Sequence, residues 1–237
     1  MFTEKDFKVD LVNKEQVKHF IEEHGRFACV CYDTDTKYAE KVGLECLKSG
    51  HFSGSRHLFF VFDLKMVPRF TIDQLVRHEQ GVVKNVQSLR YCNKDGKINL
   101  YMAPEFEDNL DAKLKLREFE YYYGIIYGNL QNAFKDPLVS TYPIISDKER
   151  LNELTRTTMP IGIATECNFA CNLEALIHLA NVRLCNRAEL PIRHLVQLMV
   201  QEVVEVEPRY SKYLVPKCVA NGFCNESKSC GMYERME

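Results

Sequence analysis

Arginine, histidine and amide side chains gather in three short stretches of the chain, in the combinations that a nucleotide-binding site needs. The stretches run over residues 51–57, 74–91 and 156–183. Guanidinium groups offer paired donors that match phosphate oxygens, and side-chain amides offer a donor and an acceptor to the edge of a base or a ribose. The residue types alone therefore favour binding of a phosphorylated nucleotide.

The spacing within these stretches would bring several polar groups together. On a helix, Gln74 lies one turn from both Arg77 and His78. If the chain that follows is extended, Ser88 and Arg90 project to the same side. Each feature also has an ordinary interpretation, because an Arg–His pair is usually a solvated helix end and Ser88 could be a turn serine.

Three polar residues fall on one predicted helix, over 172–183. Glu174 and His178 share a helix face, whereas Arg183 lies about half a turn around the helix from Glu174. One helix could therefore serve two different ligand surfaces, although Glu174 and His178 are also compatible with an ordinary surface pair.

Hydrophobic periodicity predicts a mixed α and β fold that could position these groups. Helices are expected over 14–23, 35–48, 71–77, 144–155, 172–183 and 191–206 and within the Tyr-rich region 105–150, and strands over 26–32 and 57–65. The chain of 237 residues is long enough for one large domain, which we place at 1–215, followed by a loop-like, cysteine-containing tail at 216–237.

Composition limits the partners that the chain can have. Because 31 Lys and Arg face 33 Asp and Glu, the net charge of -2 gives no general attraction to nucleic acid or an anionic membrane, and any anion must be held by locally placed arginines. The longest apolar runs, such as 58–62, are too short to span a bilayer, and the start shows no apolar signal stretch. We expect a cytoplasmic protein that binds neither nucleic acid nor membrane.

The region from His51 to Tyr91 resembles the signature of the flavin-dependent thymidylate synthases, the ThyX family. That family shows His-x-Ser/Thr-x-x-Glu-His, an apolar strand, Gln-x-x-Arg-His-Arg, and then Asn and Ser-x-Arg-Tyr. The matching residues here are His51, Ser53, His57, Gln74, Arg77, His78, Asn85, Ser88, Arg90 and Tyr91.

The second half of the chain resembles the same family independently. Arg156-x-x-Met-Pro is similar to the family's Arg-x-x-Leu-Pro, and Asn172-Leu-Glu174 is similar to Asn-Ala-Arg. The segment 183–193 is similar to the arginine-containing helix and the Ala-Gln-x-x-Ile-Arg that follows it. The resemblance covers residues 15–206 in the family's order.

This resemblance implies an α+β domain with a mixed sheet, flanking helices and a homotetrameric assembly in which several subunits build each site. It also implies a methyltransferase that converts dUMP to dTMP. Methylenetetrahydrofolate would be the carbon donor, and FAD reduced by NADPH would supply the hydride. The partners are then dUMP, a folate and further copies of the chain.

Carried over residue by residue, the resemblance assigns two sets of site residues. Arg183 would lie against the uracil edge and Ser88 near the pyrimidine, and we take both as catalytic, Ser88 as a positioning group because no adjacent base is legible. The dUMP set is Gln74, Arg77, Gln87, Ser88, Arg90, Arg156 and Arg183. The FAD set is Ser53, Arg77, His78, Glu79, Gln80, Asn85, Asn172, Glu174 and His178. His51 and His57 could contact flavin or folate, or could be structural.

The sequence departs from the family's motifs at several charged positions. Glu79 replaces the second arginine of Arg-His-Arg, Arg56 replaces a glutamate, Val86 replaces an acidic residue and Glu174 replaces an arginine. We interpret Gly81 as a point where the backbone approaches a phosphate, and hypothesise that Arg56 restores the cation lost at Glu79. These changes keep two alternatives open, a dUMP hydroxymethylase of the same fold and a non-catalytic nucleotide-binding protein.

Ten cysteines without an export signal are expected to be reduced thiols. We expect Cys29 and Cys31 to lie in a buried element. The tail carries Cys218, Cys224 and Cys230, whose five-residue separations exceed those usual between paired zinc ligands. We therefore expect no metal, and none of the cysteines matches the active-site positions of the family.

Overall fold

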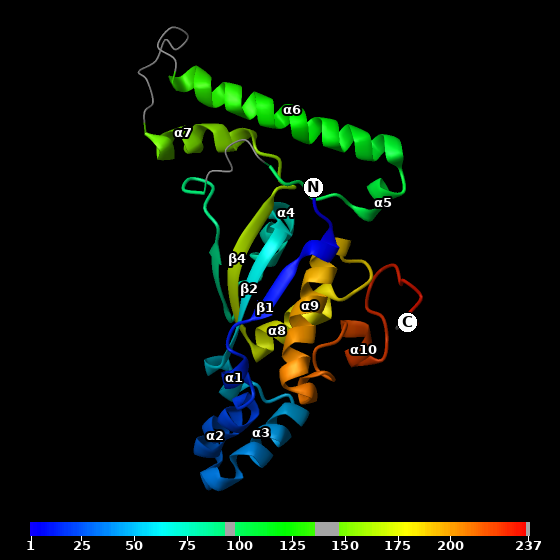
Figure 1. Cartoon of the computed structure of the whole chain (residues 1–237). Coiled ribbons are helices and arrows are strands. Elements are labelled where there is room, and N and C mark those ends of the chain that lie inside the picture. The colour runs from blue at the N-terminus through cyan, green and yellow to red at the C-terminus, as the bar shows by residue number, and fades with distance from the viewer. Residues whose placement is uncertain (93–97, 136–146, 236–237) are drawn as a thin grey trace. The chain divides into compact units, whose positions relative to one another are not determined.

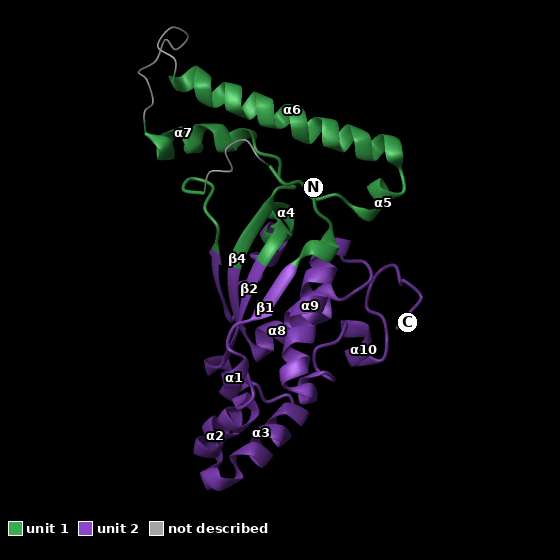
Figure 2. Cartoon of the chain, in the orientation of Figure 1, with its two compact units in different colours: residues 1–7, 65–72, 86–167 green, residues 8–64, 73–85, 168–237 purple. Residues whose placement is uncertain are grey.

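The chain is assembled from two compact units whose segments alternate along the sequence. Figure 1 shows the computed structural model, which describes residues 1–92, 98–135 and 147–235. Unit 1 consists of residues 1–7, 65–72 and 86–167, and unit 2 of residues 8–64, 73–85 and 168–237 (Figure 2). Each unit therefore draws on three separate segments, and no single boundary in the sequence separates them.

A four-stranded sheet has the strand order β1-β2-β4-β3, and predicted site residues lie at the ends of its strands β3 and β4. Its strands are β1 (Lys8–Leu11), β2 (Phe59–Pro68), β3 (Val82–Val86) and β4 (Ala164–Asn172). Gln87 N donates to Glu166 O, and Asn172 N donates to Gly81 O, so β3 and β4 run in opposite directions. The α+β class is confirmed, but the sheet is antiparallel where a mixed sheet is expected.

The helices of unit 2 pack against each other and against the sheet. α9 lies against β1 and α8, α10 lies against α8, and α2 pairs closely with α3. Gly25 and Gly43 permit the last contact, because an added Cβ would lie 1.7 Å from Ala39 O and 2.0 Å from Ile21 O, respectively. The helices are α1 (Lys14–Val17), α2 (Phe20–Tyr32), α3 (Ala39–Lys48), α8 (Leu173–Arg183), α9 (Leu190–Val206) and α10 (Lys217–Asn221).

The predicted strand over 26–32 is wrong, because these residues complete α2. A strand would place Cys29 and Cys31 on one face, whereas the helix buries Cys29 and exposes Cys31. The β-branched Val30, which favours a strand, is 81% exposed. The expected helix over 14–23 is also broken, since α1 ends at Val17 and α2 begins at Phe20.

Unit 1 is built around a small cluster of buried side chains from three parts of the chain. Ile98, Leu100, Tyr123, Tyr127 and Ile163 form this cluster. The Tyr127 hydroxyl accepts a hydrogen bond of 2.9 Å from Thr155, which satisfies its polar end inside the cluster. The helices of unit 1 are α5 (Pro104–Glu107), α6 (Leu110–Lys135) and α7 (Lys148–Thr155), and α4 (Arg69–Leu75) begins in unit 1 and ends in unit 2.

Most of the expected helices are present, with shifted ends. The helix expected over 144–155 is α7, although residues 144–146 lie outside the described part of the chain. The loop-like tail contains the short helix α10, which Gly222 ends with a φ of 78°. Among the described residues, no helix is both long and apolar enough to cross a bilayer.

Candidate functional site

A pocket of about 820 Å³ opens in unit 2 beside the first turn of α8. It collects seven of the nine residues predicted to hold FAD, whereas the exposed side chains of Ser53 and Asn85 are not among its lining residues. The pocket is lined by Arg56, Arg77, His78, Glu79, Gln80, Gly81, Asn172, Glu174, Ala175 and His178. Its volume is within the range of small-molecule sites.

Gly81 and Asn172 join the turn before β3 to the start of α8. Gly81 has a φ of +67°, and an added Cβ would lie 2.5 Å from Asn172 Nδ2. Asn172 Oδ1 accepts a hydrogen bond of 3.0 Å from Ala175 N and so caps α8. Asn172 and Ala175 both line the pocket, so the pocket meets the positive end of the α8 dipole, which favours an anionic ligand group.

Arg56 and Glu174 form an ion pair across the pocket wall. Arg56 Nε lies 2.8 Å from Glu174 Oε2, and Arg56 Nη2 lies 3.4 Å from Glu174 Oε1. The two residues stand where the resembling family has the opposite charges, so the two reversals compensate each other. Because Arg56 is engaged by Glu174, it is not a spare cation that replaces the arginine missing at Glu79, and that hypothesis is not supported.

His78 connects the pocket to Arg183. Arg183 Nε donates to His78 Nε2 at 3.1 Å, and the His78 ring packs edge-on against His178 with centroids 5.6 Å apart. Burial, followed by the charges of Arg183, His178 and Lys84, lowers the pKa of His78 to about 4. His78 is therefore neutral at pH 7, and its Nε2 can accept the hydrogen bond from Arg183 Nε. The two terminal nitrogens of Arg183 remain for other partners.

Arg183 also lies in the electrostatic field of Arg77 and Glu189. Burial, and then repulsion by Arg77, lower the pKa of Arg183, while Glu189 acts in the opposite direction. The same Glu189 accepts a hydrogen bond of 2.5 Å from Gln74 Nε2, so it orients an amide that is predicted to contact the nucleotide. Glu189 is absent from the predicted site; its place in the motif, at the family's Gln, is the signal that could have identified it.

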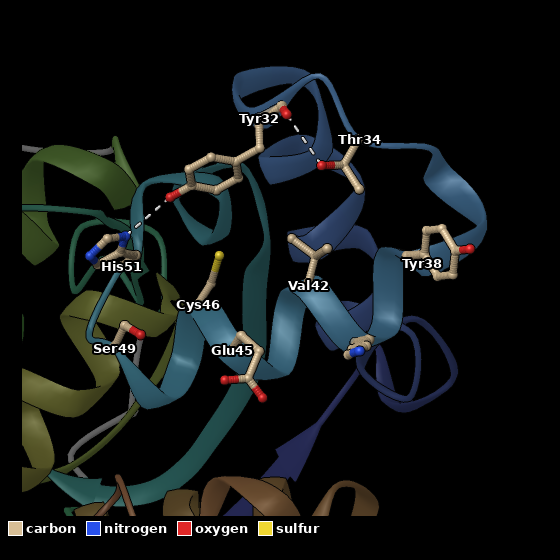
Figure 3. Close-up of a pocket in the computed structure, with 9 residues that line it drawn as sticks. Tyr32, Thr34, Tyr38, Val42, Glu45, Cys46, Ser49 and His51 are labelled. Carbon is tan, nitrogen blue, oxygen red and sulfur yellow. Dashed lines mark hydrogen bonds between the residues drawn. The ribbon is translucent and has the colours of Figure 1, made fainter.

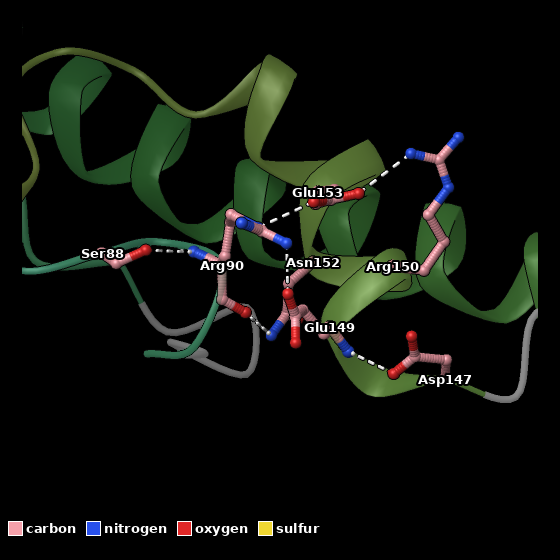
Figure 4. A network of polar contacts seen from close by, with 7 residues as sticks. All are labelled: Ser88, Arg90, Asp147, Glu149, Arg150, Asn152 and Glu153. Atoms are coloured by element: carbon pink, nitrogen blue, oxygen red, sulfur yellow. Dashed lines mark hydrogen bonds and ion pairs between the residues drawn. The ribbon is translucent and has the colours of Figure 1, made fainter.

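The other predicted dUMP residues, Gln87, Ser88, Arg90 and Arg156, belong to unit 1. Figure 4 shows Arg90 between two carboxylates of α7. Its Nη2 contacts Glu149, and its Nε lies 2.7 Å from Glu153. Asn152 Nδ2 donates to Arg90 O at 2.8 Å and fixes the backbone. The guanidinium predicted to bind phosphate is thus held by acidic residues in this structure.

Ser88 and Arg156 differ in their surroundings. Ser88 Oγ accepts a hydrogen bond of 3.3 Å from Arg90 N, which is a donor and cannot remove the serine proton (Figure 4). This contact fits a positioning group better than a nucleophile. Arg156 follows α7 with an exposed side chain, and its charge helps to lower the pKa of Glu153, after the larger effects of Arg150 and Arg90.

The remaining histidines of the first motif lie outside this pocket's lining. His51 lines a second pocket of about 610 Å³ between α2 and α3, where its Nδ1 lies 3.3 Å from the Tyr32 hydroxyl (Figure 3). The His57 ring packs against Phe27 with centroids 5.0 Å apart. The structural interpretation therefore suits His57, and His51 belongs to a different surface.

Comparison with solved structures identifies the class of fold. A crystal structure of the UMP/dUMP methylase PolB from Streptomyces cacaoi bound with 5-Br dUMP matches with a TM-score of 0.61 and 16% sequence identity, over 88% of this chain and 94% of PolB. The complex of PolB with 5-Br UMP matches with a TM-score of 0.60 and 17% identity, over 92% and 95% of the two chains. The described fold is therefore shared with the methylase PolB.

Sequence comparison identifies the family. Residues 16–209 match the Thy1 family model, "Thymidylate synthase complementing protein". The flavin-dependent thymidylate synthase of Clostridium tetani is 32% identical over 79% of this chain and 75% of its own length. That of Nitratidesulfovibrio vulgaris is 30% identical over 79% and 74%. This chain belongs to the Thy1 family.

Proposed function

We propose that this enzyme is a flavin-dependent thymidylate synthase that converts dUMP to dTMP, with methylenetetrahydrofolate as carbon donor and NADPH as reductant. Membership of the Thy1 family and the similarity to flavin-dependent thymidylate synthases support this reaction. The observation that carries the proposal is the contact between neutral His78 and Arg183 beside the pocket at α8. Through this contact Arg183, a fixed cation that suits a pyrimidine, lies next to a pocket that suits a dinucleotide cofactor.

The pocket residues fit FAD. The N-terminal turn of α8 and the exposed guanidinium of Arg77 would hold the diphosphate, and the carboxylate of Glu79 would accept hydrogen bonds from ribose hydroxyls. Glu174 keeps Arg56 oriented at the rim. When bound, the flavin would supply the hydride that completes the new methyl group.

Arg183 would act on the uracil ring of dUMP. A guanidinium keeps its proton in a protein, so Arg183 stabilises negative charge on the ring and makes the carbon that receives the one-carbon unit more nucleophilic. His78 fixes the guanidinium through Nε and directs the terminal nitrogens. Gln74, oriented by Glu189, would contact the base or ribose edge.

The phosphate of dUMP would be held by arginines. Of the two that are predicted for this role in unit 1, Arg90 and Arg156, only Arg156 has an exposed side chain. Arg90 would contribute after exchanging at least one carboxylate of α7 for the phosphate, because carboxylate and phosphate oxygens accept the same paired hydrogen bonds from a guanidinium. Ser88 and Gln87 would position the nucleotide in the same part of unit 1.

We also propose a cytoplasmic homotetramer with shared sites. All ten cysteines are free thiols, which suits a reducing compartment. The supporting surface is a set of exposed apolar side chains on α6, the helix that also carries the buried Tyr123 and Tyr127. A second copy of the chain would cover these exposed side chains, because exposed apolar patches mark interfaces. The set consists of Leu110, Leu114, Phe119, Tyr121, Tyr122, Ile125 and Ile126.

Purified protein tests the proposed reaction directly. A flavin absorption band bleached by NADPH, dUMP-dependent NADPH oxidation and a nucleotide product with the mass of dTMP are expected. A hydroxymethylated product would instead identify a dUMP hydroxymethylase. Colourless protein that retains dUMP affinity would identify a non-catalytic nucleotide-binding protein.

Arg183→Lys tests the residue that carries the proposal. Loss of a group that stabilises charge in the transition state reduces kcat by about 100-fold or more, and we expect a loss of that size with FAD affinity unchanged. Arg193→Lys is the matched control, because Arg193 donates to Asn186 O and lies outside the pocket lining. Equal activity of the two variants would refute the role of Arg183.

A further inference from the structure

Four cysteines from two distant parts of the chain line one pocket of unit 2. Cys185 follows α8, Cys218 lies in α10, and Cys224 and Cys230 lie in the tail. The pocket has a volume of about 160 Å³ and lies outside the candidate site described above. The function proposed above uses none of these thiols.

The loop after α8 and the tail touch each other next to two of these thiols. Asn186 Nδ2 lies 3.7 Å from Cys230 Sγ. Arg187 Nη1 forms an ion pair of 3.0 Å with Glu226 and lies 3.4 Å from Lys228 O. These contacts hold the tail against the loop that contains Cys185, so Cys185 and Cys230 belong to directly contacting segments.

The four thiols are not equivalent. Cys230 is exposed, and hydrogen bonds from the Met232 backbone and the Asn186 side chain lower its pKa. Burial raises the pKa of Cys218, with Cys185 and Cys224 adding to the effect, and Cys224 is itself buried. Because the thiolate is the nucleophile, Cys230 is the most reactive thiol of the pocket.

The observations favour thiol oxidation over metal binding. Within the described residues, no group of three or more His, Cys, Asp and Glu side chains is arranged to hold a metal ion. The pocket instead holds the exposed, activated thiol of Cys230 on a segment that contacts the loop carrying the half-buried Cys185, and redox-sensor cysteines are exposed, low-pKa thiols with a second thiol nearby.

We propose that Cys230 and Cys185 form a reversible oxidation site, which hydrogen peroxide converts to a disulfide. The Cys230 thiolate attacks one peroxide oxygen, the O–O bond breaks, and Cys230 becomes a sulfenic acid as the other oxygen leaves as water. Cys185 then attacks the Cys230 sulfur, the S–S bond forms, and the S–O bond breaks to release a second water. Two thiols lose two electrons in total, and the peroxide gains them.

The disulfide would tie the tail to the end of α8. Cys185 is two residues from Arg183, so the bond would restrain the C-terminal end of the helix that carries the candidate catalytic arginine. A thiol reductant would reopen it.

Peptide mapping of the full-length protein tests the pairing. Trypsin cleaves after Arg183, Arg187, Lys228 and Arg235, so the two thiols fall in the separate peptides LCNR and SCGMYER. After a few equivalents of hydrogen peroxide, we expect these peptides to be joined by a disulfide that dithiothreitol reverses. In Cys185→Ser, Cys230 should accumulate as a sulfenic acid that dimedone traps.

Matched variants separate a specific site from general oxidation. Cys31 is the control for exposure, and it should be oxidised several-fold more slowly than Cys230. Glu226→Gln loosens the contact with Arg187, so it should slow disulfide formation several-fold without changing the first oxidation of Cys230.

Three results would overturn the proposal. The first is equal oxidation of Cys31 and Cys230. The second is a disulfide that joins Cys230 to any thiol other than Cys185. The third is one equivalent of tightly bound zinc in the purified protein with all four thiols protected from peroxide, which would make the pocket a metal site.

Discussion

Replacing Gly81 by alanine should destabilise unit 2 by about 1 kcal/mol more than the same replacement at Gly50. Both glycines have left-handed backbones, with φ values of +67° and +71°. At Gly50 nothing lies within 4 Å of the added Cβ, whereas at Gly81 the Cβ would lie 2.5 Å from Asn172 Nδ2 and 2.7 Å from Asn172 Oδ1. The two sites therefore share the backbone strain and differ in the clash.

The expected magnitudes follow from these two terms. A left-handed backbone costs a residue with a Cβ roughly 1–2 kcal/mol, and this applies to both variants. Displacing Asn172 at Gly81 also removes the cap of α8, and losing an asparagine cap costs about 1 kcal/mol. Alanine also restricts the unfolded chain, but equally at both positions, so that effect cancels in the comparison.

Chemical denaturation of four variants measures the clash by itself. Gly81→Ala, Gly50→Ala, Asn172→Ala and the double variant Gly81→Ala/Asn172→Ala are compared with the unaltered protein. In the Asn172→Ala background the clashing atoms are absent, so Gly81→Ala should cost no more than Gly50→Ala. Affinity for FAD should fall in Gly81→Ala and remain in Gly50→Ala, because only Gly81 lines the pocket.

Two results would refute this reasoning. If Gly81→Ala and Gly50→Ala were equally destabilising, the Gly81–Asn172 contact would not support the helix cap. If the effects of Gly81→Ala and Asn172→Ala were simply additive, the two residues would act independently.

Three further predictions concern charge, pH and assembly. Arg56→Glu or Glu174→Arg alone places like charges together and should raise the Kd for FAD several-fold in a flavin-fluorescence titration. The double reversal should restore the Kd. A double variant that binds FAD as weakly as either single variant would contradict compensation. His78 has a pKa of about 4 in the fold, mainly through burial and then through Arg183, against about 6.5 when unfolded, so the unfolded chain binds the extra proton between these values and stability should fall as pH drops from 6.5 to 4. His78→Gln keeps an acceptor that does not titrate and should flatten this dependence in denaturation midpoints, and an unchanged pH profile would exclude His78 as its source. Ile126→Glu on α6 should reduce the mass measured by light scattering without unfolding the chain, and an unchanged mass would argue against assembly through this face.

The sequence predicts best where an apolar pattern repeats with the period of a helix. The helices expected over 35–48, 172–183 and 191–206 correspond to α3, α8 and α9, and Pro191 lies in the first turn of α9 as expected. β4 has no such signal. Its buried positions alternate, but they are occupied by Thr165, Cys167, Phe169 and Cys171, of which two are thiols with little strand preference.

The sequence predicts which residues close together in the chain contribute to the candidate site. It does not predict which residues from distant segments contact each other there. The residues after α4 and at the start of α8 do meet in one pocket, because each group is held together by its own turn or helix. The partners within the site depend on tertiary structure. Arg56 and Glu174 are far apart in the sequence, and each alone reads as a departure from the family; only their contact shows that the changes compensate.

The alternation of the two units along the chain has a consequence for synthesis on the ribosome. The chain passes between the units five times, at residues 7, 64, 72, 85 and 167. Unit 1 lacks its last segment until residue 167 has emerged, and unit 2 lacks α8 and α9 until later still. Contacts between such distant segments slow folding. The nascent chain must therefore hold its first 160 or so residues without a completed core, and during this period it is exposed to chaperone binding and aggregation.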